Sequence, residues 1–225
     1  MKLIEAARQK KRGTIRKLAN YYAEYDFMFA GYKDKPIRLL EIGVQGGGSL
    51  YTWKEFFPQV KIIGIDIDES CQKYEGENIK IYIGSQEDSN FLRSVENKEG
   101  PFDIVIDDGG HTMKQQIITF NTLFPLLKES GIYVIEDLHT SYWYEFGGKK
   151  GRVYTAISLI KKIIDGMHYW AIQSPRASLF NRIKNKIKTL EIKSSRYDNV
   201  RAIYIADSIA FIRKETIKKD EMLKF

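Results

Sequence analysis

The chain has 225 residues, of which 29% are charged and 43% are hydrophobic, with 17 Gly and 5 Pro. This length is enough for one globular domain with a sizeable core, and the ordinary composition excludes collagen-like, low-complexity and largely disordered proteins. The single cysteine, Cys71, excludes an internal disulfide and a cysteine-based metal site. Because no apolar run reaches the roughly 20 residues of a membrane helix and the N-terminus lacks a signal-peptide pattern, we expect a cytoplasmic protein without membrane insertion.

The formal net charge of +7 is unevenly distributed along the chain. Residues 1–40 carry a net +6, residues 41–150 a net −8 and residues 151–225 a net +9. An excess of Lys and Arg is one mark of proteins that bind nucleic acid or another polyanion. Because the central block is acidic, the charge pattern argues against a polyanion-binding surface there.

The predicted elements begin with one or two helices in the N-terminal block. In the central block, short apolar runs alternate with longer amphipathic stretches, which is typical of β-α units and of a parallel sheet covered on both faces. Predicted strands there are residues 37–42, 60–65, 79–83, 102–106 and 131–135, and predicted helices are residues 49–57 and 112–127.

The last block is predicted to add a helix over residues 153–164 and a hairpin of strands 202–205 and 209–213. Residues 181–196 are either a basic amphipathic helix or a loop. The order of elements predicts an α/β fold: a Rossmann-like, doubly wound, mostly parallel seven-stranded sheet with a C-terminal antiparallel hairpin.

A glycine-rich loop, Gly43–Gly48, follows the first predicted strand and precedes a helix. This arrangement lets a ligand approach backbone N–H groups at a helix N-terminus. The loop departs from the dinucleotide fingerprint G-x-G-x-x-G because Gln45 stands where the second glycine belongs, and Glu41 before the loop is unusual for an NAD site. A glycine-rich turn without a ligand is the alternative.

Asp66 ends the second predicted strand at about the distance from the first glycine, roughly 20 residues, that is expected of an acid that bonds ribose hydroxyls. The loop and this acid together predict an adenosine-containing cofactor. Ser85–Asp88 supply polar groups at the same sheet edge, where an adenine would be read. Strand-end and helix-capping roles are the alternatives for these residues.

Four acids and a histidine follow the fourth and fifth predicted strands. Asp107, Asp108 and His111 belong to IDDGGH, and Glu136 and Asp137 belong to IEDLH. Parallel strands place these groups at one sheet edge, beside the glycine-rich loop. Converging carboxylates repel one another unless a cation or hydrogen-bond donors offset their charge, which favours a hard divalent ion such as Mg²⁺. Solvated carboxylates at strand ends are the alternative.

Three histidines are candidates for different roles. His111 is a candidate general base because an unperturbed imidazole titrates near neutrality, and a hydrogen-bonded structural histidine is the alternative. His139 either faces substrate or has a capping or surface role, and His168 is expected to pack among its aromatic neighbours. The aromatic stretch Ser141–Phe146 either forms a wall of a substrate pocket or packs over the sheet edge.

These motifs, in this order, resemble a class I S-adenosylmethionine-dependent methyltransferase. The blocks LLEIGVQGGGSLYTW, IIGIDID, GSQED, IDDGGH and IEDLHTSYW are together similar to the metal-dependent sugar O-methyltransferases of the mycinamicin and tylosin tailoring type, with the cephalosporin hydroxylase and rhamnosyl O-methyltransferase groups as relatives. The likeness covers residues 13–150 well. The macrolide-sugar enzymes carry a large additional N-terminal domain, whereas residues 1–36 precede the first predicted strand here.

The resemblance implies a role for each matching residue. It assigns the methionine part of the cofactor to the glycines, the ribose to Asp66 and the adenine border to Gln86 and Asp88. The complete set assigned to S-adenosylmethionine is Glu41, Gly43, Gly46, Gly47, Asp66, Gln86, Asp88 and Asp107. The set assigned to Mg²⁺ or another divalent cation is Asp108, Glu136 and Asp137. His111 matches the general base, and His111 and Asp108 form the catalytic pair.

The implied reaction is methylation of a hydroxyl on a sugar, nucleotide sugar or glycoside. A cation-dependent O-methyltransferase of phenols or catechols is one rival. An RNA-binding methyltransferase that uses Lys10–Arg12 and Lys184–Lys193 is a second, disfavoured by the acidic site, and a fold that binds cofactor without catalysis is a third. A homo-oligomer is left open, and the basic flanks are candidates for attracting an anionic acceptor.

We therefore predict one methyltransferase domain over residues 1–225. Residues 1–36 form its N-terminal helical segment, residues 37–150 its cofactor and metal core, and residues 151–225 its C-terminal helix, basic segment and hairpin.

Overall fold

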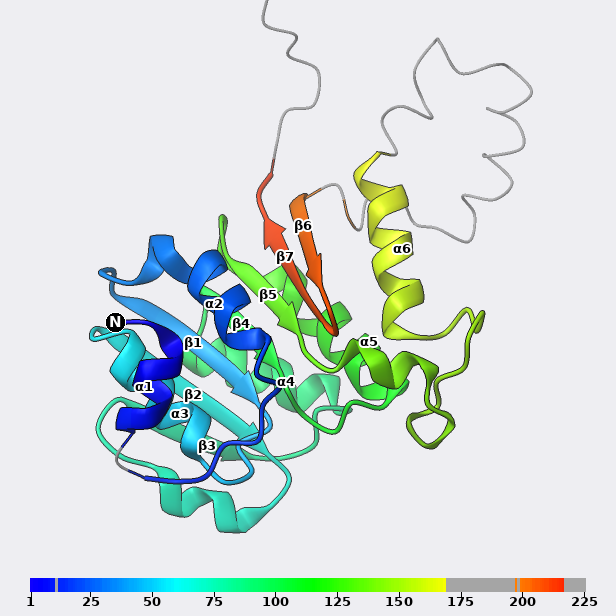
Figure 1. Ribbon diagram of the computed structural model, residues 1–225. Coiled ribbons are helices and arrows are strands. Elements are labelled where there is room, and N and C mark those ends of the chain that lie inside the picture. Colours follow the sequence, from blue (N-terminus) through cyan, green and yellow to red (C-terminus); the bar gives the residue numbers. More distant parts are fainter. Residues whose placement is uncertain (11, 169–196, 198, 217–225) are drawn as a thin grey trace, which may run out of the picture.

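A mixed sheet of seven strands forms the centre of the computed structural model, which describes residues 1–10, 12–168, 197 and 199–216. Within these residues the strand order is β3-β2-β1-β4-β5-β7-β6, with the first five strands parallel and β7 antiparallel to both of its neighbours (Figure 1). The strands are β1 (Ile37–Ile42), β2 (Val60–Asp66), β3 (Ile79–Ile83), β4 (Ile104–Asp107), β5 (Ile132–Ile135), β6 (Val200–Ala206) and β7 (Ile209–Lys214). The predicted α/β fold with its C-terminal hairpin is confirmed.

Helices cover both faces of the sheet because its strands are apolar on both sides (Figure 1). Successive side chains of a strand point to opposite faces, and the neighbours Leu39 and Leu40 of β1 accordingly belong to two separate apolar clusters. One cluster packs against α1 (Leu3–Gln9), α2 (Tyr21–Phe29) and α3 (Gly48–Phe56). The other packs against α4 (Ser89–Glu99), α5 (Met113–Leu123) and α6 (Ala156–Met167). Burying each large apolar side chain stabilises the fold by roughly 1.5–3 kcal/mol.

Some helix boundaries differ from the predicted ones for local reasons. The helix predicted from residue 153 begins as α6 at Ala156, because the Thr155 side chain accepts a hydrogen bond from the Ser158 N–H and caps it. The helix predicted over 112–127 ends at Leu123 and continues as a 3₁₀ turn through Pro125, whose ring removes a backbone donor. The 3₁₀ turns are η1 (Ala30–Tyr32), η2 (Glu69–Tyr74), η3 (Phe124–Leu126), η4 (Leu138–Tyr142) and η5 (Tyr144–Phe146).

The carboxyl ends of four strands meet at one edge of the sheet, and this edge positions the candidate site. Ile42 of β1 pairs with Ile65 of β2 and with Asp107 of β4, which in turn pairs with Ile135 of β5. The residues that lie next to these pairs in the chain are Gly43, Asp66, Asp108 and Glu136. The register therefore brings the motifs of four separate strands together.

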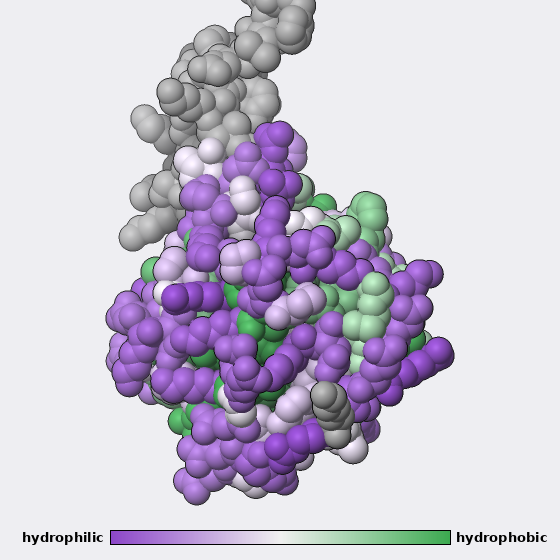
Figure 2. All heavy atoms as spheres, turned by 90° about the vertical axis from the view of Figure 1, so that its left-hand side faces the viewer, coloured by the Kyte–Doolittle hydropathy of each residue, from purple (hydrophilic) through white to green (hydrophobic). Residues whose placement is uncertain are grey.

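Charged and polar residues predominate on the face of the molecule shown in Figure 2. None of the helices in the described ranges is long and apolar enough to cross a membrane. The basic stretch over residues 181–196, predicted as a helix or a loop, lies outside the described residues.

Candidate active site

A cavity of about 930 Å³ opens at the carboxyl edge of the sheet. Its walls are residues 14–18 of the N-terminal segment, the glycine-rich loop after β1, the end of β2 and the loops that follow β3, β4 and β5. This volume lies within the range of small-molecule and cofactor pockets in proteins. The cavity is therefore large enough for a nucleoside-containing ligand, and the predicted motifs surround it.

The glycine-rich loop packs closely against neighbouring backbone. Gly43 has φ +94°, and a Cβ there would lie 2.0 Å from the Asp108 carbonyl oxygen, so no larger residue fits. Gly47 has φ +69° and immediately precedes α3. Gly43 and Gly46 line the cavity, whereas Gly47 is not among the described residues that line it. Gly43 thus lets the loops after β1 and β4 approach each other at the cavity.

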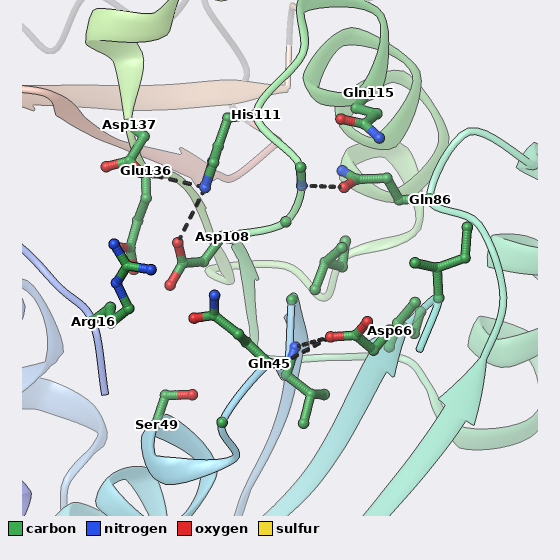
Figure 3. Close-up of a pocket in the computed structure, with 18 of the residues that line it drawn as sticks. Arg16, Gln45, Ser49, Asp66, Gln86, Asp108, His111, Gln115, Glu136 and Asp137 are labelled. Atoms are coloured by element: carbon green, nitrogen blue, oxygen red, sulfur yellow. Dashed lines mark hydrogen bonds and ion pairs between the residues drawn. The ribbon is translucent and has the colours of Figure 1, made fainter. Parts of the chain in front are cut away.

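Asp66 binds the glycine-rich loop directly (Figure 3). Its Oδ2 accepts hydrogen bonds from the backbone N–H groups of Val44 and Gln45, each at 2.8 Å, and its Oδ1 accepts one from the Asp68 N–H at 3.0 Å. Asp66 also lines the cavity. The carboxylate predicted to hold a ribose therefore orders the glycine-rich loop through the backbone N–H groups that it binds.

Two further acids of the predicted cofactor set, Glu41 and Asp107, are not among the described residues that line the cavity. Glu41 is fully buried and accepts a hydrogen bond from the Ser49 hydroxyl at 2.9 Å. Asp107 is also fully buried and accepts one from the Gln86 amide at 3.1 Å. Burial raises the pKa of Glu41 to about 7 and that of Asp107 to about 6.

The two residues predicted to border an adenine differ in their placement. Gln86 lines the cavity, and its amide oxygen accepts a hydrogen bond from the Gly110 N–H at 2.9 Å, which ties it to the loop after β4 (Figure 3). Asp88 caps α4 instead, accepting hydrogen bonds from the N–H groups of Asn90 and Phe91 at 2.8 and 3.1 Å. Asp88 therefore has the contacts of a helix-capping residue, the alternative to a role at the adenine.

His111 points between two carboxylates at the cavity (Figure 3). Its Nε2 lies 3.3 Å from Oδ2 of Asp137 and 3.8 Å from Oδ1 of Asp108, and the donor atoms of the three residues lie within 4.8 Å of one another. His111 and Asp137 both have positive φ, 55° and 54°, a backbone conformation that His and Asp adopt more readily than most residues. The Nδ1 atom of His111 is buried and has no hydrogen-bond partner among the described residues.

Glu136 lies on the other side of Asp108 and faces different partners. Its Oε1 accepts hydrogen bonds from Lys17 Nζ and from the Tyr25 hydroxyl. The same Lys17 Nζ lies 2.8 Å from Oδ2 of Asp108, so one ammonium group bridges the two acids. Burial and the neighbouring Asp108 carboxylate raise the pKa of Glu136. The structure thus groups Asp108 with His111 and Asp137 on one side and with Glu136 and Lys17 on the other.

Residues of the N-terminal segment complete the site, and sequence reasoning missed them. Lys17 contacts acids 91 and 119 positions away, and Tyr25 contacts Glu136 from 111 positions away. Tyr21 donates a hydrogen bond to Oδ1 of Asp137 at 2.8 Å. No local motif marks these three residues. Tyr21 and Tyr25 lie in α2, whereas Lys17 lies in the stretch between α1 and α2, so the one shared signal is their place ahead of the first strand.

The other two histidines and the aromatic stretch lie around the cavity or outside it. His139 lines the cavity, its Nδ1 contacts the Ser208 hydroxyl, and its ring lies 4.5 Å from that of Trp143. Tyr144 is 85% exposed, so the stretch is not simply packed over the sheet. His168 is exposed, and its Nδ1 lies 2.9 Å from the Ile164 carbonyl oxygen at the end of α6. Its predicted aromatic neighbours, residues 169 and 170, lie outside the described residues.

The donor groups fit a divalent cation. Asp108 and Asp137 offer carboxylate oxygens next to one imidazole, and hard divalent ions prefer oxygen ligands. The seating of the Lys17 ammonium group between Asp108 and Glu136 shows that this acid pair accommodates positive charge. The same acidic lining suits a cationic cofactor beside the glycine-rich loop.

The chain is similar in sequence to curated sugar O-methyltransferases. No protein-family model matches the chain. The 8-demethyl-8-(2-methoxy-alpha-L-rhamnosyl)-tetracenomycin-C 3'-O-methyltransferase of Streptomyces olivaceus is 41% identical over 170 residues, which cover 69% of this chain and 43% of the relative. The mycinamicin VI 2''-O-methyltransferase of Micromonospora griseorubida is 40% identical over 160 residues, 67% of this chain and 40% of the relative. The chain thus spans less than half the length of these curated relatives.

Solved structures show the same relationship. The MycE methyltransferase from the mycinamycin biosynthetic pathway, in complex with Mg, SAH and mycinamycin VI, matches 100% of this chain and 57% of its own, with a TM-score of 0.80 and 30% sequence identity. An O-methyltransferase from Bacillus cereus in complex with SAH shares the fold, with a TM-score of 0.50 at 12% identity. Sequence and fold together place the chain in the class I S-adenosylmethionine-dependent methyltransferase family, among relatives that are sugar O-methyltransferases.

Proposed function

We propose that this chain transfers a methyl group from S-adenosylmethionine to a hydroxyl of a sugar or glycoside, with a divalent cation and with His111 as general base. The observation that carries the proposal is the position of His111 Nε2, 3.3 Å from Asp137 and 3.8 Å from Asp108, at a cavity beside the glycine-rich loop. The names of the curated relatives, and the Mg and SAH of the MycE complex, support the reaction class and both cofactors.

His111 supplies the proton acceptor that this reaction needs. A sugar hydroxyl holds its proton tightly at neutral pH, so attack on a methyl group is slow without a base. Nε2 of His111 takes that proton, and the carboxylates of Asp137 and Asp108 stabilise the imidazolium that forms. Tyr21 holds Asp137 in place from the opposite side. No acid is needed for the departing cofactor, because it leaves as a neutral thioether.

The same geometry supports the proposed metal and cofactor sites. Asp108, Glu136 and Asp137 would hold the cation, which lowers the pKa of hydroxyls bound to it and orients them. In this proposal Gly43, Gly46 and Asp66 contact the cofactor directly. Four other residues of the predicted cofactor set do not line the cavity, and in this proposal they support the loops and the helix next to it: Glu41, Gly47, Asp88 and Asp107. We propose that residues 1–225 form a single methyltransferase domain.

The acceptor class is tested by a product screen. Purified protein is incubated with S-adenosylmethionine and Mg²⁺ and offered glycosides, nucleotide sugars and catechols in parallel, with products identified by mass spectrometry. The proposal expects a methylated sugar. Methylation of catechols alone would contradict the acceptor class while leaving the methyltransferase assignment intact.

A further inference from the structure

One lysine occupies the space between two carboxylates that the proposed function assigns to a metal ion. Lys17 Nζ lies 2.8 Å from Oδ2 of Asp108 and also donates to Oε1 of Glu136. Its side chain is only 3% exposed, so the ammonium group has exchanged water for these acids. An ammonium group in such a place needs close negative charge to remain ionised.

The contacts of Lys17 are those of a buried ammonium ion. Its Nζ binds both Asp108 and Glu136 and lies 5.7 Å from the centre of the Tyr25 ring. Close carboxylates and an aromatic face both stabilise a buried ammonium group. The positive charge of Lys17 offsets part of the repulsion between Asp108 and Glu136.

The backbone around Lys17 is tied to the glycine-rich loop. The Thr14 N–H donates to the Gly46 carbonyl oxygen at 3.0 Å, and the Gly48 N–H donates to the Thr14 carbonyl oxygen at 3.2 Å. In Figure 1 this dark blue segment between α1 and α2 passes the carboxyl ends of the central strands. The segment thus holds Lys17 at the cavity wall, where the open space of the cavity and the four rotatable bonds of the side chain would let the ammonium group move off the acids.

We propose that Lys17 is the resident cation of this acid cluster, and that a divalent cation binds by displacing its ammonium group from Asp108 and Glu136. This inference rests on the metal site of the proposed function. Both cations require the same two carboxylates, and a metal ion bound to their oxygens would lie within a few ångströms of an ammonium group still bound there. Lys17 therefore lowers the affinity for the metal and keeps the acid pair ordered before the metal arrives.

The test is a metal titration of purified variants. Mg²⁺ binding is measured calorimetrically for the wild type, for Lys17→Met, which keeps an unbranched side chain one atom shorter and without its charge, and for Lys54→Met as a matched control. Lys54 pairs with the exposed Glu77, and neither residue lines the cavity. We expect Lys17→Met to bind Mg²⁺ about tenfold more tightly or better, and Lys54→Met to match the wild type. Equal or weaker binding by Lys17→Met would overturn the proposal.

A second measurement uses the wild type alone and so does not depend on the folding of a variant. Amine-specific acetylation followed by mass spectrometry reports whether Lys17 is accessible. Lys17 should be protected without metal and labelled at saturating Mg²⁺, and protection that persists at saturation would overturn displacement. If Mg²⁺ binds to neither the wild type nor Lys17→Met, the metal site of the proposed function fails together with displacement. If both bind it equally, displacement fails by itself.

Discussion

Tyr21 and Asp137 are joined by two hydrogen bonds across 116 positions of the chain: the tyrosine hydroxyl donates to Oδ1 at 2.8 Å and accepts from the Asp137 N–H at 3.1 Å. The remaining oxygen of the same carboxylate, Oδ2, faces His111 at 3.3 Å. A helix ahead of the sheet therefore sets the orientation of the acid that faces the proposed base. The N-terminal segment is part of the site as well as part of the core.

Replacing His111 by alanine should abolish most methyl transfer while leaving cofactor binding intact. A general base contributes roughly 10²–10⁴ in rate, so we expect the turnover number to fall by about that factor. Steady-state kinetics and calorimetric binding of S-adenosylhomocysteine measure the two effects separately. His168→Ala is the control, because His168 is exposed at the end of α6, and its rate should equal that of the wild type. A His111→Ala rate within threefold of the wild type would rule out the base.

Tyr21→Phe should lower both stability and turnover. The change leaves the Asp137 N–H and Oδ1 without their partner, which costs about 1–3 kcal/mol of unfolding free energy. It also frees the carboxylate that faces His111, so we expect turnover to fall by about tenfold. Chemical denaturation and kinetics measure the two effects. Tyr204→Phe removes a hydroxyl that binds Glu24 instead, and it should leave turnover unchanged. Unaltered turnover in Tyr21→Phe would show that Asp137 needs no such support.

Glu41 should make the protein less stable as the pH rises. Burial raises its pKa from 4.5 to about 7, so between these values the folded protein holds a proton that the unfolded chain has released. Stability from this group is therefore complete below about pH 4.5 and is lost as the pH rises through 7. Relative to the wild type, Glu41→Gln should gain about 3 kcal/mol of unfolding free energy between pH 4.5 and 8. The exposed Glu77→Gln should show no such trend, and a flat difference for Glu41→Gln would contradict the raised pKa.

The sheet and the meeting of its motifs could be predicted from the sequence because both depend on short-range patterns. Apolar runs that end in acids or glycine mark parallel strands, and parallel strands bring their carboxyl ends to one edge. That reasoning placed His111 beside Asp108 and Asp137. The same pattern carries no information about which acid faces which partner, so the separation of Glu136 from the histidine could not be foreseen.

What the sequence could not show depends on contacts between distant segments. Lys17 sits in a stretch with no motif, and only the folded chain brings it to Asp108 and Glu136. The role of Asp66 in ordering the glycine-rich loop follows from backbone N–H directions, which residue spacing does not specify. At Asp88 two explanations fit the sequence equally well, and its contacts are those of a helix cap.

The central claim is that the acids beside His111 work with a divalent cation, and the most direct measurement is the rate of methyl transfer to a glycoside with and without that ion. Protein treated with a chelator and desalted is assayed with S-adenosylmethionine, first alone and then with Mg²⁺ restored. The account predicts a rate at background after chelation and full recovery on adding Mg²⁺. An undiminished rate in the metal-free protein would contradict it.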